Sequence, residues 1–597
     1  MDVSSQRLGT PAASSRRWLF GLFASVLAAG VSVTGGAVAA SAHGPGGMVA
    51  VIVQCEQART ATVAATVTRS GGHVTRQLTS TDNVIATLPR AALSQLRTAP
   101  GVRAVTVDTS VRLSGAKWTP DGDPYSMYSV DTISGATTAF GLKLTGKGIG
   151  VALIDSGISP VKGLDGTGKV VNGPDLSFES SSPNLAHLDS FGHGTHMAGI
   201  IAGRDPEVAV GKEDDSKNFV GMAPDAKLIN VKVAAGDGAV DVSQVIAGID
   251  WVVTHRNDPG LNIKVLNLSF GTDSLQDERL DPLSHAVESA WRNGIVVLVA
   301  SGNDGVTQSR MGMPAANPYV IAVGAADSAT TRLKVDDLVT AFSTGGNATR
   351  HPDLLAPGRS IASLRDPHSY IDATYPTGLI ATDKAQRYFR GSGTSQATAV
   401  VSGAVALLLQ QRPSLTPDQV KQLLTSTAVK LDPKKSPLSL NPLSQGSGEL
   451  NLQLALLAPT LLSAAQTWPK SSGAGTLEAS RGTAFVLDPI NGVELHGEKD
   501  IMGQSWNSGT WSTRASAGTA WSAGTWNGRV WSGSGWTGTT WNTATLTGTD
   551  WAGVAWSNQI WSTGTWSATG WTGRSWTGRS WTGRSWTSGY WSAGSLQ

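Results

Sequence analysis

Hydrophobic and polar positions follow two alternating patterns through the middle of the chain. Short apolar runs predict buried strands, and longer segments with apolar residues at helical spacing lie between them. The predicted strands are 149–154, 228–233, 265–268, 295–299 and 320–323, and the predicted helices are 242–254, 282–293 and 397–411. This alternation predicts an α/β domain over residues 120–458, in which a mostly parallel sheet carries helices on both faces.

An earlier segment, residues 48–113, has a different order of elements. Strand-like runs at 48–54, 73–78, 84–88 and 102–107 are interrupted by helical patterns at 57–70 and 90–97. The resulting β-α-β-β-α-β order predicts a small α+β unit of the ferredoxin-like kind.

The first 42 residues have the pattern of an export signal. Arg16 and Arg17 precede an apolar run over 18–29, and small residues follow it. We expect a cleaved signal peptide at 1–42, with an uncleaved membrane anchor as the alternative, and therefore a secreted or cell-surface protein. Cys55 is the only cysteine in the chain, so an internal disulfide is excluded.

The end of the chain has two parts. Residues 459–505 form a connector with a strand-like run near 484–487, and residues 506–597 carry a tryptophan at nearly every fifth position. Side chains spaced five residues apart do not all lie on one face of a strand, and they do not all lie on one face of a helix. The repeat is interpreted as a β-solenoid or hairpin array stabilised by tryptophan, or as a ladder of exposed rings that binds cell-wall polymers or polysaccharide.

Length and charge narrow the class of protein. A chain of 597 residues is too long for one core, so several domains are expected. A net charge of +2, with no basic block, argues against nucleic acid as the main partner.

Three separated motifs carry the candidate chemistry. Asp155 ends an apolar strand-like run, His193 lies in Gly-His-Gly-Thr-His-Met-Ala-Gly, and Ser395 lies in Gly-Ser-Gly-Thr-Ser-Gln-Ala-Thr, just before the apolar helix. A serine hydroxyl is a weak nucleophile until a base takes its proton, and a carboxylate can orient that base. The chain order Asp, His, Ser is one in which such triads occur.

These motifs resemble those of the subtilisin-like serine proteases, or subtilases, over about residues 48–458. The resemblance implies a subtilisin-like fold, and a propeptide at 48–113 that assists folding and inhibits the enzyme. It implies that Asn303, in Ala-Ser-Gly-Asn-Asp-Gly, helps to stabilise the oxyanion, that His196 is structural, and that Pro314 is a candidate cis-proline. The substrate-binding residues it implies are Gly238, Ala239, Val240, Ser269, Phe270, Gly271, Ala300, Ser301 and Gly302.

Two departures from the family pattern stand out. The segment after Ser395 has Ala399 where the family usually has proline, which predicts a more regular helix and an altered division of the acyl-enzyme between water and amines. The insertion that contains Glu213, Asp214 and Asp215 is interpreted as a solvated acidic loop, with a structural calcium site as the alternative.

Together these features predict a secreted serine endopeptidase that is made as a zymogen and cleaves peptides through an acyl-enzyme. Its chemistry requires no cofactor, and its partners are protein or peptide substrates and its own propeptide. The alternative is a cell-surface or polysaccharide-binding protein in which the protease-like domain is a scaffold.

Overall fold

The computed structural model describes residues 48–79, 81–107, 118–177, 179–180, 185–435, 439–460, 464–486, 494–522, 524–530, 539–541 and 544–546. The chain divides into two compact units, Met1–Ser114 and Gly115–Gln597. The predicted signal peptide lies outside the described residues, as do most of the tryptophan positions after residue 530. Within the described part of the chain, no helix has the length and apolar character needed to cross a membrane.

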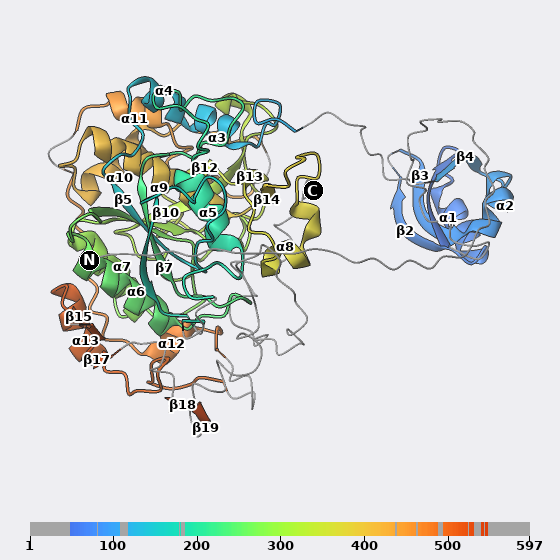
Figure 1. Ribbon diagram of the computed structural model, residues 1–597. Helices are drawn as coiled ribbons and strands as arrows, with labels where there is room; N and C mark the ends of the chain where they lie inside the picture. The colour runs from blue at the N-terminus through green and yellow to red at the C-terminus, as the bar shows by residue number, and fades with distance from the viewer. Residues whose placement is uncertain are drawn as a thin grey trace, which may run out of the picture. The chain divides into compact units, whose positions relative to one another are not determined.

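The first unit is a four-stranded antiparallel sheet with two helices (Figure 1). Its elements are β1 Met48–Cys55, α1 Thr60–Arg69, β2 His73–Leu78, β3 Asn83–Pro89, α2 Leu93–Arg97 and β4 Val102–Val107. The strand order β2-β3-β1-β4 is that of a ferredoxin-like unit, so the predicted α+β class is confirmed. Val53, Val67, Val84 and Leu96 lie in its own hydrophobic core.

The second unit is built on a mixed, mostly parallel sheet in the order β11-β10-β9-β8-β5-β7-β6, with β12 beside β10. Its strands are β5 Gly150–Asp155, β6 Val170–Asp175, β7 Lys227–Lys232, β8 Ile263–Leu268, β9 Val296–Ala300, β10 Ile321–Asp327, β11 Leu338–Val339 and β12 Leu354–Pro357. Only β11 runs antiparallel to its neighbour. The prediction of a mostly parallel α/β sheet is confirmed.

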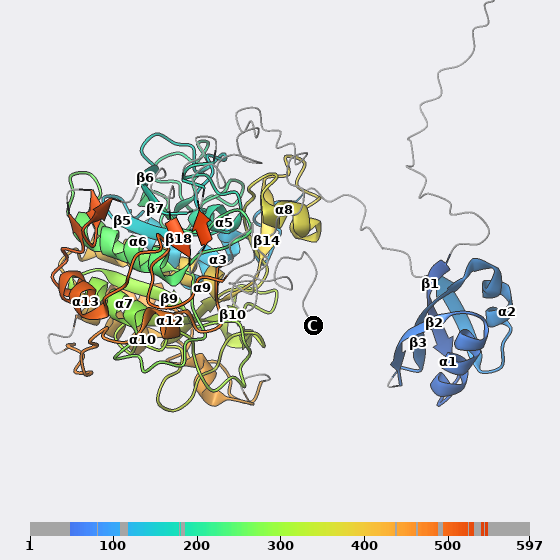
Figure 2. The same ribbon diagram turned by 90° about the horizontal axis from the view of Figure 1, so that it is seen from below.

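Helices cover both faces of this sheet. Ile154 lies beside Leu268 in the sheet, and a methyl group at Gly248 in α6 would lie 3.4 Å from the Ile154 side chain. The preceding residue of β8, Asn267, faces the other way and accepts a hydrogen bond from Ser402 of α9 at 2.9 Å. Helix α6 therefore lies on one face with α7, and α9 lies on the opposite face with α5 (Figure 2).

The four main helices are α5 His193–Ala202, α6 Val242–His255, α7 Pro282–Arg292 and α9 Thr394–Gln411. Shorter elements complete the unit: α3 Met127–Ser134, α4 Ala136–Gly141, α8 Tyr370–Thr374, α10 Pro417–Thr427, α11 Leu452–Leu457, and the hairpin of β13 Ile361–Leu364 with β14 Tyr388–Gly391. The peptide bond between Met313 and Pro314 is cis, as the family resemblance predicts.

The segment after residue 458 continues to pack on the second unit. It contains α12 Leu477–Arg481, α13 Ser508–Ser516, the strands β15 Trp521–Ser522, β16 Thr525–Trp526 and β17 Arg529–Val530, and the pair β18 Thr539–Trp541 and β19 Ala544–Leu546. Helix α12 contacts α6 and α7, and α13 contacts α7. The connector is therefore part of the folded unit, and no strand forms at the described residues 484–486 of the predicted run.

The first tryptophans of the repeat are buried, which corrects the prediction of an exposed ladder at these positions. Trp511 and Trp526 are 0 % and 1 % exposed, and Trp506 and Trp521 are each 7 % exposed. The indole N–H groups of Trp511 and Trp526 both donate to Asp250 Oδ2, at 2.8 and 2.9 Å, and that of Trp521 donates to the Ala247 carbonyl at 2.7 Å. Residues 508–516 are helical, so the predicted β array is also wrong for this stretch. The prediction of a β array fails here because α6 and α7 offer apolar surface that the tryptophan rings cover.

Candidate active site

Asp155 and His193 form a buried pair at the end of β5 and the start of α5. The Nδ1 atom of His193 lies 2.8 Å from Asp155 Oδ1 and 2.9 Å from Oδ2. Both residues are 1 % exposed. A carboxylate can only accept, so the shared proton sits on Nδ1 and Nε2 is left as the ring's lone-pair atom. This is the tautomer in which an imidazole can take a proton at Nε2.

A second buried carboxylate fixes the start of the helix that carries His193. Asp189 accepts the backbone N–H groups of Gly192 and Thr195 at 2.7 and 2.6 Å, in the manner of a helix cap. It also accepts the Ser156 hydroxyl at 2.7 Å, and the same hydroxyl oxygen receives the N–H of Gly194 at 3.0 Å. Burial raises the pKa of Asp189, against these hydrogen bonds, which lower it. Sequence reasoning missed this residue, although its place four residues before His193 marks a helix N-terminus.

His196, one turn further along α5, has a different environment. Its Nε2 atom lies 3.2 Å from the Phe389 carbonyl oxygen. Burial and the neighbouring His193 lower the pKa of His196 to about 3, so it is neutral at ordinary pH.

Ser395 lies in the first turn of α9 and is 3 % exposed. The helix begins at Thr394, three residues earlier than the apolar pattern suggests. The backbone N–H of Ser395 is therefore one of the first-turn amides that have no carbonyl acceptor within the helix. Such amides and the helix dipole favour negative charge at this end.

Asn303 is held so that its amide nitrogen faces the turn before Ser395. Its Oδ1 atom accepts from both the backbone N–H and the hydroxyl of Thr394, each at 3.0 Å. Nδ2 is left on the other side, where a methyl group added at Gly393 would lie 3.5 Å from it. Thr394 also receives the Gly302 N–H at 3.3 Å, so one threonine joins the loop after β9 to the start of α9. Sequence reasoning missed this role for Thr394.

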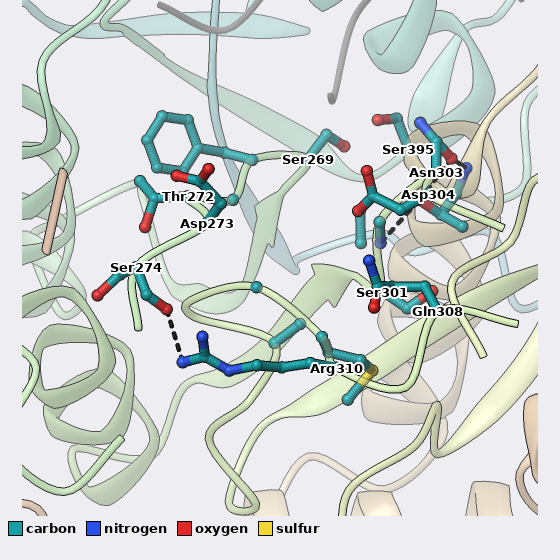
Figure 3. Close-up of a pocket in the computed structure, with 18 of the residues that line it drawn as sticks. Ser269, Thr272, Asp273, Ser274, Ser301, Asn303, Asp304, Gln308, Arg310 and Ser395 are labelled. Atoms are coloured by element: carbon teal, nitrogen blue, oxygen red, sulfur yellow. Dashed lines mark hydrogen bonds between the residues drawn. The ribbon is translucent and has the colours of Figure 1, made fainter. Parts of the chain in front are cut away.

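Ser395 and Asn303 line one cavity of about 200 Å³. Figure 3 shows them on one side, with Thr272, Asp273 and Ser274 on the other and Arg310 along the base. Six of the substrate-binding residues predicted from the resemblance line this cavity: Ser269, Phe270, Gly271, Ala300, Ser301 and Gly302.

The structure does not bring the other three predicted substrate-binding residues to this cavity. Ala239 and Val240 are buried, and Gly238 takes a positive φ of 84° in a turn that packs on the Phe191 ring. Cavity residues that sequence reasoning missed include Thr272, Asp273, Asp304 and Arg310.

The acidic insertion does not present a free set of calcium ligands. Glu213 is paired with Arg204 at 3.1 Å, and Asp215 accepts the N–H groups of Lys217 and Asn218 within its own turn. No group of three or more His, Cys, Asp or Glu side chains that could hold a metal occurs among the residues that the structure covers. Glu213 and Asp215 are engaged by Arg204 and by backbone N–H groups, and a calcium site at this loop stays a prediction.

A buried carboxylate–imidazole pair and a helix-start serine, carried on an α/β sheet, define a candidate serine hydrolase site. Comparison with known sequences agrees: the model of the "Subtilase family" matches residues 146–450, and that of the "Putative peptidase inhibitor domain" matches residues 26–108. The chain belongs to the subtilase family of serine proteases.

Three relatives illustrate the extent of the similarity. Serine protease AprX of Bacillus subtilis is 40% identical over 290 residues, which are 48% of this chain and 62% of AprX. Subtilisin E of the same species is 32% identical over 397 residues, or 65% of this chain and 84% of subtilisin E. Minor extracellular protease Epr is 31% identical over 313 residues, or 52% of this chain and 40% of Epr. The match thus spans less than two thirds of AprX and Epr but most of subtilisin E.

Proposed function

We propose that the protein is a secreted endopeptidase, made as a zymogen, in which Ser395 attacks the scissile carbonyl of a bound peptide. His193 takes the serine proton at Nε2 and returns it to the leaving amine. Asp155 keeps the ring in the required tautomer and stabilises its cation. Water then enters, His193 activates it, and the acyl-enzyme is hydrolysed. Apart from the peptide and the water molecule, each step uses groups of the chain itself.

The observation that carries this proposal is the Asp155–His193 pair at 2.8 Å. Helix α5, which begins at His193, contacts α9 on the same face of the sheet, and Ser395 lies in the first turn of α9. The oxyanion would be held by the Ser395 N–H and Asn303 Nδ2. The orientation of the Asn303 amide supports that role, because its oxygen is occupied by Thr394 and its nitrogen faces the serine turn.

The proposal of a zymogen rests on the small N-terminal unit. Residues 48–107 have their own core and match an inhibitor-domain model, and they precede the protease in the chain. The name of the relative Epr includes the word extracellular, which supports the expectation of secretion from the pattern at 1–42. Binding of cell-wall polymer stays a prediction for the tryptophans beyond residue 530.

The test is to compare the full-length protein with its Ser395→Ala variant and with Ser522→Ala, an exposed serine outside the cavity. Wild type and Ser522→Ala should react with a serine-directed fluorophosphonate probe, cleave an extended peptide and remove residues before about 118. Ser395→Ala should do none of these and should accumulate as the uncleaved precursor. Equal labelling of Ser395→Ala, or no peptide cleavage by processed wild type, would contradict the proposal.

A further inference from the structure

One wall of the cavity is the loop from β8 to α7, and a segment far along the chain lies against its outer side. This brace segment comprises residues 472–483, beyond the end of the subtilase match at 450. Its backbone N–H groups at Ser472 and Gly475 donate to the carbonyls of Arg279 and Leu280, at 2.6 and 2.7 Å. The brace segment thus runs along the loop rather than past it.

The end of α12 holds the buried part of the loop. The Thr272 hydroxyl, which lines the cavity, donates to the Ser480 carbonyl at 2.8 Å. The Ser480 hydroxyl in turn donates at 3.1 Å to Asp281, the residue that caps α7. Thr272 and Ser480 are both buried, so neither bond competes with water.

Asp273 is held by two bonds from the brace segment. Its Oδ1 atom accepts the Thr483 N–H at 2.7 Å, and its Oδ2 atom accepts the Thr483 hydroxyl at 2.5 Å. The chain approaches so closely here that a Cβ atom at Gly482 would collide with Asp273 Oδ1. Asp273 lines the cavity and Thr483 does not, so both oxygens of this carboxylate are held by a residue outside the cavity lining.

The same segment also holds the stretch next to the other predicted substrate residues, 238–240. Arg481 is fully buried, and its Nε atom lies 2.7 Å from Asp241 Oδ1. Asp241 caps α6 by accepting the N–H of Ser243 at 2.9 Å. Three consecutive residues, 481–483, therefore join the start of α6 to the loop that walls the cavity.

We infer that the brace segment positions the substrate-binding wall, and that its residues Ser480 and Thr483 are positioning residues for extended peptide substrates. This inference rests on the proposed function. The brace segment touches the wall and not the reacting groups, so its loss should weaken binding of ground state and transition state alike. Such a loss raises KM and leaves kcat nearly unchanged.

The test uses the full-length, processed enzyme with Ser480→Ala and Thr483→Val combined. The matched control combines Ser522→Ala with Thr513→Val, the same chemical changes at exposed positions, where the Thr513 hydroxyl bonds only to its own helix. The two changes remove the bond from the Ser480 hydroxyl to Asp281 and the bond from the Thr483 hydroxyl to Asp273. Their loss should raise KM for an extended peptide about ten-fold or more. Labelling by a small fluorophosphonate should proceed at the wild-type rate, and Thr483→Ser, which keeps its hydroxyl, should keep the wild-type KM.

A purely structural role would instead lower the melting temperature and the titre of active sites, with KM of the surviving enzyme equal to that of the control. That result would overturn the inference while leaving the proposed function intact. If the double variant does not fold, Thr483→Val alone, at an exposed position, is measured, and a KM equal to that of Thr513→Val overturns the inference. Absence of Ser395-dependent cleavage in wild type would instead remove the proposed function itself.

Discussion

At the scale of single residues, the decisive geometry is the direction of one amide. Thr394 occupies Asn303 Oδ1 with two donors, and these bonds fix which way the amide group is turned. Donors that are aimed in advance at a developing charge contribute most when they replace reorganising solvent. If Asn303 stabilises the oxyanion as proposed, Thr394 is the residue that orients it.

We expect Asn303→Leu to reduce kcat by about 100- to 1,000-fold, because it removes one proposed oxyanion donor. Leucine is chosen because its side chain is similar in size to that of asparagine. KM should change little, since the donor acts on the tetrahedral intermediate rather than on the bound peptide. Steady-state kinetics on a chromogenic peptide measures both quantities. A large rise in KM with unchanged kcat would show that Asn303 contacts the ground-state substrate instead.

The residues that carry the candidate chemistry were predictable because each lies in a short motif. Asp155 ends an apolar run, His193 and Ser395 follow glycines, and Asn303 follows a strand. Thr394 was not predictable, because its role depends on a bond to Asn303, which only the folded chain brings near. Asp189 had a local signal in its place before α5, but its bond to Ser156 was not predictable for the same reason. A buried carboxylate or hydroxyl has no distinct signature in the sequence until its partners are known.

At the scale of elements, the helix α6 covers one face of the sheet, and the C-terminal segment packs on the outer side of this helix. Asp250, near the middle of α6, is buried and accepts indole N–H groups from Trp511 in α13 and Trp526 in β16. Burial raises the pKa of Asp250 to about 7, although the two indole donors lower it. One carboxyl group thus ties three elements together and titrates near neutral pH.

The sign of the effect on stability follows from this raised pKa. The unfolded chain loses the Asp250 proton near its ordinary pKa of about 4, whereas the folded chain keeps it until about pH 7. The stabilising contribution is therefore full below about pH 4 and is lost as the pH rises through 7. Asp250→Asn stays neutral, and its single carbonyl oxygen can accept both indoles, as Oδ2 does now.

We expect Asp250→Asn to melt near the wild-type temperature at pH 4 and above it at pH 8. Thermal unfolding followed by circular dichroism gives the difference in melting temperature between variant and wild type at each pH. The other titrating groups are the same in both proteins, so their effects cancel in this difference. Asp418→Asn is the matched control, because Asp418 accepts the Trp291 indole at 2.7 Å in a half-buried position. A variant that is equally destabilised at both pH values would contradict the assignment of a shifted titration to Asp250.

The central elements were predictable and the edge elements were not. Strands β5 and β9 are nearly continuous apolar runs, and β7 and β8 are mostly apolar with an asparagine inside each, because helices bury both faces of the sheet. Strand β6 reads Val-Val-Asn-Gly-Pro-Asp, which lacks that pattern because it lies at the sheet edge. The prediction for Ala399 is not tested by these elements, although α9 does continue as a helix through residue 399.

At the scale of the whole molecule, the folded protease unit extends well beyond the part that resembles other subtilases. The match ends at residue 450, whereas α12, α13 and the strands β15 to β17 follow it and cover α6 and α7. The five-residue tryptophan period did not predict this, because it specifies neither a helical nor a strand face. The first tryptophan rings are buried against helices α6 and α7, which are distant in the sequence. The local five-residue pattern carries no information about that surface.

We therefore expect a chain that ends at residue 458 to fail as a folded protease. It would lose the three rings that donate to Asp250 and Ala247, and loss of one buried tryptophan alone costs about 3–5 kcal/mol. It would also leave the buried Asp241 without Arg481, and breaking a buried ion pair costs about 3–5 kcal/mol. The sum is comparable to the whole stability of an ordinary domain, which is about 5–15 kcal/mol.

A chain that ends at residue 530 is the matched control, because it keeps α12, α13, the strands β15 to β17 and every contact that they make with α6 and α7. Both chains are to be produced with the Ser395→Ala change, so that self-digestion does not obscure the comparison. The longer chain should show a cooperative melt and resist trypsin, and the shorter one should be degraded or insoluble. If both melt at the same temperature, the C-terminal elements do not stabilise the protease, and their burial of α6 and α7 has no thermodynamic weight.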